Sequence, residues 1–184
     1  MPVSSFFEEV YSNGSSQILI RSGFNYVDIC AVGGGGAGRR GGGGAGGVAT
    51  KTYRVLESEW GGFLTCSIGA AVVSANGLPT TVNGTLGGSA ITELKGFGGD
   101  RGATVVGGIG GSFSGGDAVE WPTMNLAGQD GTEYVDSVNP GLGGRVQDIL
   151  LYQAGSHTIG AGGNGDVSAG QNGFAGNVYL RWKV

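Results

Sequence analysis

Few side chains in this sequence of 184 residues are suited to acid–base or nucleophilic chemistry. The single histidine, His157, lies in the turn-like sequence Gly-Ser-His-Thr. One histidine is enough for a catalytic triad, but no serine lies in the Gly-x-Ser-x-Gly context that exposes a nucleophile, and neither cysteine has such a setting. We therefore interpret His157 as a structural or surface residue.

Carboxylates gather between residues 117 and 148, where a glycosidase would need a pair of them. Their spacing selects no two as partners, and residues 129–133 (Gln-Asp-Gly-Thr-Glu) do not supply the alternating ligands of an EF-hand calcium loop. The sequence thus predicts a surface cluster, no metal, no cofactor and no enzymatic activity. The acids concerned are Asp117, Glu120, Asp130, Glu133, Asp136 and Asp148.

The charge pattern and the apolar runs exclude further classes of protein. The string Gly-x-Gly-x-x-Gly can be read at residues 33–38, but no helix pattern follows it to bind a phosphate, so we do not expect nucleotide binding. The net charge is −4 and the basic residues are scattered, which argues against a nucleic-acid partner. No apolar run has the length of a membrane span, and the acidic N-terminus is unlike a signal peptide, so we expect synthesis in a cytoplasm and no membrane insertion.

The elements that must carry these residues are strands. Apolar residues alternate at Val27, Ile29 and Ala31, at Leu64, Cys66 and Ile68, and at Val178, Leu180, Trp182 and Val184, which predicts one buried face in each segment. On the last strand, Asn177, Tyr179, Arg181 and Lys183 are expected to face solvent. Weaker signals fall at residues 16–21, 48–56, 80–86 and 104–106, and one helical turn is the most we expect at residues 148–152. The predicted fold class is an all-β protein, a β-sandwich with long glycine-rich loops.

Glycine, with 43 residues, dominates the chain and gathers in tracts at residues 33–47, 96–116 and 141–176. Collagen is excluded because there are only 4 prolines and no strict triplet period. The tracts either pack, in whole or part, as a polyglycine II-like bundle of main chain against main chain, or form irregular loops that cap the sandwich. For residues 107–112, where a larger residue recurs at every third position, the bundle predicts one outward stripe. We expect a single domain over residues 1–184, with a less glycine-rich lobe inserted at 117–157.

Two cysteines, Cys30 and Cys66, lie in apolar strand-like segments and are expected to be buried free thiols. A disulfide between them requires the two strands to be neighbours.

Five residues in the glycine tracts and the lobe are best able to contact another molecule. Their guanidinium groups and aromatic rings suit charge-assisted contacts or stacking on sugar rings. An arginine pair of this kind is more often a solvated charge, and local core explains each aromatic residue at least as well. These candidates are Arg39, Arg40, Phe113, Trp121 and Tyr134.

The order of the segments resembles the glycine-rich domain of bacteriophage tail fibres, tail adhesins and glycine-rich minor tail proteins. The resemblance covers nearly the whole chain and rests on a strand that runs directly into polyglycine at residues 26–36, a return strand at 47–56, and a closing glycine series that leads into the final strand at 159–182. It departs from that pattern in the 117–157 region and lacks the long shaft of a full fibre.

The resemblance implies a role at the distal end of a virion tail rather than a reaction. It implies attachment to a host-surface glycan or protein receptor, other virion tail proteins as partners, and a homo-oligomer, by analogy a trimer. The alternative is a purely structural minor tail or coat subunit. An ice- or carbohydrate-binding bundle would need a triplet register that residues 33–47 lack, and a glycan-active enzyme is the least favoured reading.

Overall fold

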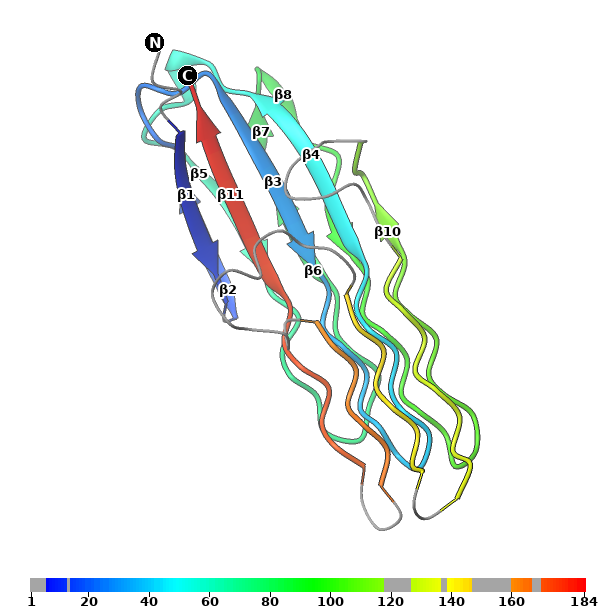
Figure 1. Ribbon diagram of the computed structural model, residues 1–184. Coiled ribbons are helices and arrows are strands. Elements are labelled where there is room, and N and C mark those ends of the chain that lie inside the picture. The colour runs from blue at the N-terminus through cyan, green and yellow to red at the C-terminus, as the bar shows by residue number, and fades with distance from the viewer. Residues whose placement is uncertain (1–5, 13, 118–126, 137–138, 147–159, 167–169) are drawn as a thin grey trace.

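The computed structural model describes residues 6–12, 14–117, 127–136, 139–146, 160–166 and 170–184, and these form an all-β fold with an extended bundle at one end (Figure 1). The predicted fold class is thereby confirmed. The single helical turn considered at residues 148–152 lies outside the described residues, as do His157 and Trp121. The described part of the chain contains no helix of the length and hydrophobicity that crossing a bilayer requires.

Two antiparallel sheets make up the sandwich. The first has the strand order β1-β11-β3-β4, and the second has the order β10-β9-β6-β5-β2, while β7 and β8 form a separate hairpin. The bounds are β1 Phe6–Tyr11, β2 Ser15–Leu19, β3 Tyr26–Val32, β4 Val48–Arg54, β5 Phe63–Ser67, β6 Thr80–Asn83, β7 Thr85–Leu86, β8 Ser89–Ala90, β9 Leu94–Gly96, β10 Phe113–Ser114 and β11 Asn177–Lys183, with a 3-10 turn, η1, at Glu57–Glu59.

The core lies between the two sheets and follows the alternation in the sequence. Val178, Leu180 and Trp182 of β11 are fully buried in it, next to the inward residues of β3 on the neighbouring strand. The second sheet contributes the other side of this core, which includes Leu64, Cys66 and Ile68. The predicted inward faces of these three segments are therefore confirmed, with the exception of Val184, which is 67% exposed because the strand has ended before it.

The outward face of β11 differs from the prediction near the bundle. Asn177 and Tyr179 were expected in solvent but are buried, whereas Arg181 and Lys183 are partly exposed as expected. Tyr179 belongs to a second apolar cluster with Cys30, Val32, Ala45, Val48 and Val146. Near the bundle, the first sheet is therefore buried on both faces. An alternating sequence pattern predicts burial of one face only, so it did not predict the second cluster.

The weaker strand predictions are partly right. The predicted segment at residues 16–21 overlaps β2, and the one at 48–56 contains β4. The segment at 80–86 is split into β6 and β7 by Gly84, whose φ is +149°. The prediction at 104–106 is wrong. These residues form a bend in which the N–H of Ala103 donates to the carbonyl of Val106 at 2.8 Å, because the chain reverses there between two glycine segments.

Both cysteines are buried and free. Cys30 lies on β3 of the first sheet and Cys66 on β5 of the second, and these strands are not neighbours, so the condition for a disulfide is not met. Burial raises the pKa of both thiols above the ordinary value.

The glycine tracts continue from the strands as extended segments that run side by side. They turn back at the end of the molecule away from the C-terminus (Figure 1). Successive N–H groups of residues 33–38 donate to three different neighbouring segments in rotation, as a helix with three residues per turn requires. Gly33 and Gly36 donate to Gly47 and Gly44, Gly34 and Ala37 donate to Leu78 and Ala75, and Gly35 and Gly38 donate to Phe174 and Gln171.

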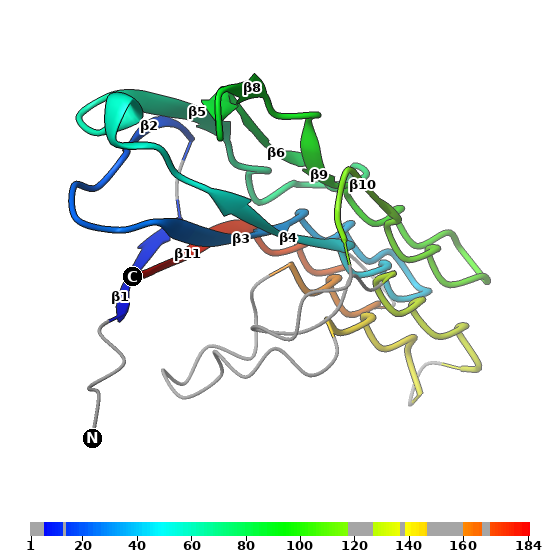
Figure 2. The same cartoon turned by 90° about the horizontal axis from the view of Figure 1, so that it is seen from above.

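Residues 41–47 occupy the centre of this bundle. Their N–H groups donate in the same rotation to the segments around residues 97–103, 129–132 and 160–163, and their carbonyls accept from the segments around 33–36, 108–111 and 144. Six segments therefore surround this one, and Figure 2 shows the segments stacked in layers. Of the two alternatives for the glycine tracts, these hydrogen bonds correspond to the polyglycine II-like bundle.

Glycine is required in the interior because main chain contacts main chain directly. A Cβ atom on Gly42 would overlap the carbonyl oxygen of Leu142, and one on Gly35 would overlap that of Ala161. Larger residues lie on the outside at intervals of three, as Ile109 and Ser112 do, which is the outward stripe predicted for residues 107–112. Of the less glycine-rich region, residues 127–136 and 139–146 run within this bundle.

Candidate functional site at the bundle tip

At the far end of the bundle, main-chain hydrogen bonds tie two chain reversals to Tyr134 and Gly141, which belong to a neighbouring part of the chain. The first contains Arg39 and Arg40, and the N–H of Gly141 donates to the carbonyl of Arg40 at 2.9 Å. The second is the bend at residues 104–106, whose Val105 carbonyl accepts from the N–H of Tyr134 at 2.8 Å. Residues distant in the sequence are thereby held in a fixed arrangement, which we call the tip.

The tip carries three of the predicted contact residues. The guanidinium carbon of Arg40 lies 5.7 Å from the centre of the Tyr134 ring, within the range of a cation–π contact. Arg39 adjoins them, and both arginines are exposed. Among the described residues, no carboxylate forms an ion pair with either guanidinium, so their hydrogen-bond donors face solvent.

Three exposed valines lie on the same reversals or next to Tyr134, and the sequence pattern did not predict them as contact residues. Val105, Val106 and Val135 are 57%, 56% and 74% exposed. The β-branched residues Thr104, Val105 and Val106 predicted a strand, although their position inside a glycine tract was the signal of an exposed turn. Exposed apolar side chains in the same reversals as exposed arginines make this end of the bundle a candidate contact surface.

The remaining candidates lie elsewhere. Phe113 is in β10, at the junction of the sandwich and the bundle, and its ring is 39% exposed, so it does not share a surface with Arg39 and Arg40. Trp121 lies outside the described residues. The five residues grouped from the sequence therefore do not form one site.

Three of the six predicted carboxylates are engaged in local structure, and Glu120 and Asp148 lie outside the described residues. Asp117 pairs with Lys51 at 3.0 Å, Asp130 accepts from the N–H of Gly110 at 2.7 Å, and Asp136 accepts from the N–H of Asn139 at 2.8 Å. Among the described residues, no three His, Cys, Asp or Glu side chains gather as a metal site would require.

The opposite end of the molecule has a different character. There β1 is the edge strand of the first sheet, and within the described residues nothing pairs with its outer edge. Phe6, Phe7 and Val10 on this strand are exposed, while its carboxylates are paired within the chain, Glu8 with Arg181 and Glu9 with Arg21. Charges that would discourage pairing at an edge strand are thus neutralised.

No protein-family model matches this chain, and no curated protein is similar to it. The resemblance stated above therefore rests on the residues and segments themselves.

Proposed function

We propose that this protein is a non-enzymatic component of a bacteriophage tail tip or tail fibre, and that it attaches the particle to the host surface through the tip. The observation that supports this proposal is that Arg39, Arg40 and Tyr134 lie together on reversals of a hydrogen-bonded bundle. The bundle ends on the side of the molecule away from the C-terminus (Figure 1). Flexible loops lose entropy when they bind, whereas loops whose main chain is already hydrogen-bonded lose little.

The chemistry of the tip suits a host glycan or a protein receptor at the cell surface. The two guanidinium groups can donate to anionic or carbonyl oxygens, and the valines supply apolar contact. Several copies in one particle would bind together, so a weak individual contact is sufficient. In this proposal the partners are the other tail proteins and the host receptor, the protein works in the virion as a homo-oligomer, by analogy a trimer, and nucleic acid takes no part.

The test is binding of the fluorescently labelled protein to a panel of bacterial strains. The triple variant Arg39→Ala, Arg40→Ala, Tyr134→Ala should bind the positive strain at least about tenfold more weakly, with an unchanged circular dichroism spectrum. Phe113→Ala is the matched control, since it removes an exposed aromatic ring distant from the tip and should bind as the wild type does. Equal binding by the triple variant and the wild type would contradict the assignment to the tip.

A purely structural role in the virion is the second candidate, and the open edge of β1 favours it. An exposed strand edge with apolar side chains on it is a surface to which a neighbouring subunit can add a strand. In particles that carry the double variant Phe6→Ser, Val10→Ser, a structural subunit should fail in particle assembly. An adhesin with an altered tip should instead give intact particles that do not adsorb to cells.

A further inference from the structure

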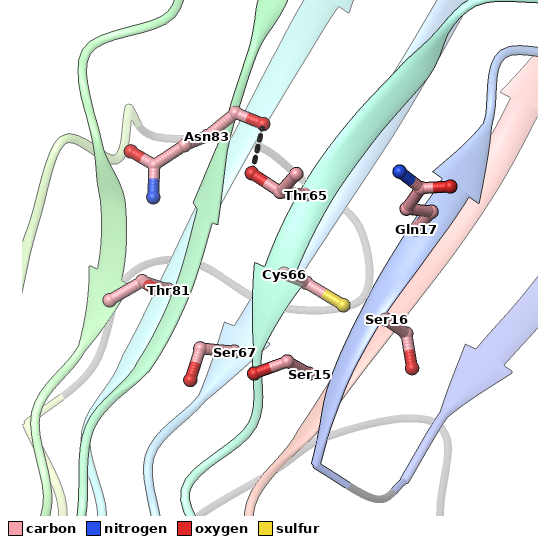
Figure 3. Close-up of a pocket in the computed structure, with 8 residues that line it drawn as sticks. All are labelled: Ser15, Ser16, Gln17, Thr65, Cys66, Ser67, Thr81 and Asn83. Carbon is pink, nitrogen blue, oxygen red and sulfur yellow. Dashed lines mark hydrogen bonds between the residues drawn. The ribbon is translucent and has the colours of Figure 1, made fainter.

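The solvent face of the second sheet carries two rows of uncharged polar side chains across β2, β5 and β6. Gln17, Thr65 and Asn83 stand opposite one another in one row, and Ser15, Ser67 and Thr81 form the next. In an antiparallel sheet neighbouring strands are about 4.8 Å apart and successive residues on one face about 6.8 Å apart, so the rows form a regular grid. A shallow depression lies on this grid (Figure 3).

The side chains around the depression have unused hydrogen-bonding capacity. Thr65 Oγ1 donates to the main-chain carbonyl of Asn83 at 3.4 Å. The other five make no side-chain hydrogen bond with the described part of the protein, and they offer hydroxyl groups and two carboxamides that both donate and accept. Gln17 and Asn83 lie on opposite sides of Thr65 (Figure 3), so a ligand can be held from both sides.

Charge is absent from the lining, and an apolar ring adjoins it. The nearest cation along the second row, Lys95, is engaged with Glu93 at 3.7 Å and lies over the Phe97 ring at 4.7 Å. Beyond the first row, Phe63 stands opposite Leu19 with 55% of its surface exposed. An aromatic ring next to hydroxyl and amide groups suits a molecule that is apolar on its C–H faces and polar at its rim.

From this combination we infer that the depression on β2, β5 and β6 is a binding site for a neutral oligosaccharide. A sugar chain presents many hydroxyl groups that exchange hydrogen bonds with Ser, Thr, Gln and Asn, and its rings can rest on Phe63. An anionic ligand would find no cation among the lining side chains, and Lys95, opposite Thr81 at the end of the second row, is paired with Glu93. An apolar ligand would leave the polar grid without partners. The site is distinct from the tip and does not depend on the tip's role in attachment.

The side-chain amides of Gln17 and Asn83 allow a direct test by ¹⁵N NMR of the intact protein. The probes are maltohexaose, laminarihexaose, mannohexaose and the N-acetylglucosamine hexasaccharide, with hexagalacturonate as the anionic comparison. We expect at least one neutral probe to shift both amide signals, with a dissociation constant on the order of 1 mM. No shift with any neutral probe at about 10 mM, or a shift with hexagalacturonate alone, would overturn the inference.

Variants then locate the site. Asn83→Ala should weaken binding of the active probe about fivefold, as the loss of one hydrogen bond implies. Ser67→Tyr, which fills the depression, should abolish the shift at Gln17. The tip variant and Ser114→Ala, at the far edge of the same face, should bind as the wild type does. Unchanged binding by both Asn83→Ala and Ser67→Tyr would place the sugar elsewhere and overturn the inference.

Discussion

At the scale of single residues, the bundle depends on the absence of side chains at particular positions. A Cβ on Gly42 or Gly108 would overlap a main-chain oxygen, of Leu142 and Asp100 respectively. At Gly34 the nearest atoms would be the carbonyl oxygens of Ala70 and Leu78, both at 3.2 Å, which small shifts can accommodate.

We therefore expect Gly42→Ala and Gly108→Ala to lower the free energy of unfolding by about 1–3 kcal/mol each, as overpacking does, and Gly34→Ala to have a smaller effect. Thermal unfolding followed by circular dichroism measures this. Ser112→Ala, on the outward stripe, is the control and should leave the melting temperature nearly unchanged. A rise in melting temperature for all three glycine variants would mean that the segments are not packed as described.

One carboxylate organises the connection after β4. Glu59 accepts from the N–H groups of Leu56, Gly87 and Gly88 at 2.9, 3.1 and 2.8 Å. Partial burial opposes ionisation, but these three donors outweigh it, and the pKa of Glu59 lies below its ordinary value. A depressed pKa stabilises the folded protein above the ordinary carboxyl value, and this contribution is lost as the pH falls through the folded-state pKa.

Glu59→Gln should accordingly lower the unfolding free energy by about 1 kcal/mol at pH 7, where the carboxylate is a better acceptor than the amide. The difference from the wild type should shrink as the pH falls below 4. Urea unfolding at pH 7 and pH 3.5 measures both values. Glu57→Gln, on the exposed side of the same turn, is the matched control. A difference that is independent of pH would exclude the carboxylate's charge as the cause.

At the scale of elements, β11 shows what sequence alternation can and cannot predict. The inward residues of β11, β3 and β5 were predictable because a half-buried strand repeats every two residues. The burial of Tyr179 was not, since it depends on a cover formed by Val146 from another segment. Likewise Thr104–Val106 has the composition of a strand, and only the pairing of the flanking glycine segments makes it a bend.

The residues of the tip could likewise be predicted only in part. Arg39 and Arg40 were recognised from their type and their place between glycine runs. Their proximity to Tyr134 could not be predicted from the sequence, because it depends on which segments of the bundle are neighbours. Glycine tracts carry almost no side-chain pattern from which that order can be read, and this is also why Phe113 was grouped with the tip.

The inward and outward assignments of β11 can be tested with three single substitutions. Leu180→Asp places an unpaired charge in the core and should prevent soluble folding, at a cost of several kcal/mol. Val184→Asp has the same spacing in the sequence but lies at an exposed end, so it should be tolerated. Arg181→Gln, which loses the ion pair with Glu8, should cost about 1 kcal/mol or less. Soluble expression and melting temperature distinguish these outcomes, and equal behaviour of Leu180→Asp and Val184→Asp would refute the assignment.

At the scale of the whole molecule, the sandwich and the bundle share their strands. β3 continues into residues 33–38, β4 follows residues 41–47, and β11 follows residues 170–176. The central segments of the bundle are therefore continuous with strands of the sandwich, without an intervening flexible linker, and we expect the bundle and the sandwich to unfold together.

Native-state hydrogen exchange provides the measurement. The amides of residues 42–46 should be protected to nearly the same degree as those of β3 and β11, whereas the exposed N–H groups of a mobile glycine linker exchange freely. The amide of Thr104, in the bend at the tip, is the internal reference for fast exchange. Fast exchange throughout residues 42–46 would show that the bundle opens independently of the sandwich.

The three-residue turn of the bundle segments also constrains how their lengths can change during evolution. Removing one residue from the 107–112 segment would rotate everything beyond it by a third of a turn and direct Ile109, now outward, at the main chain of a neighbour. Insertions and deletions within a segment are therefore tolerated only in threes and with a matching change in the segment that returns. The reversals at the tip carry no such phase restriction. Sequence length can vary freely there, so diversity among related chains is expected to concentrate at the ends of the glycine segments and not within them.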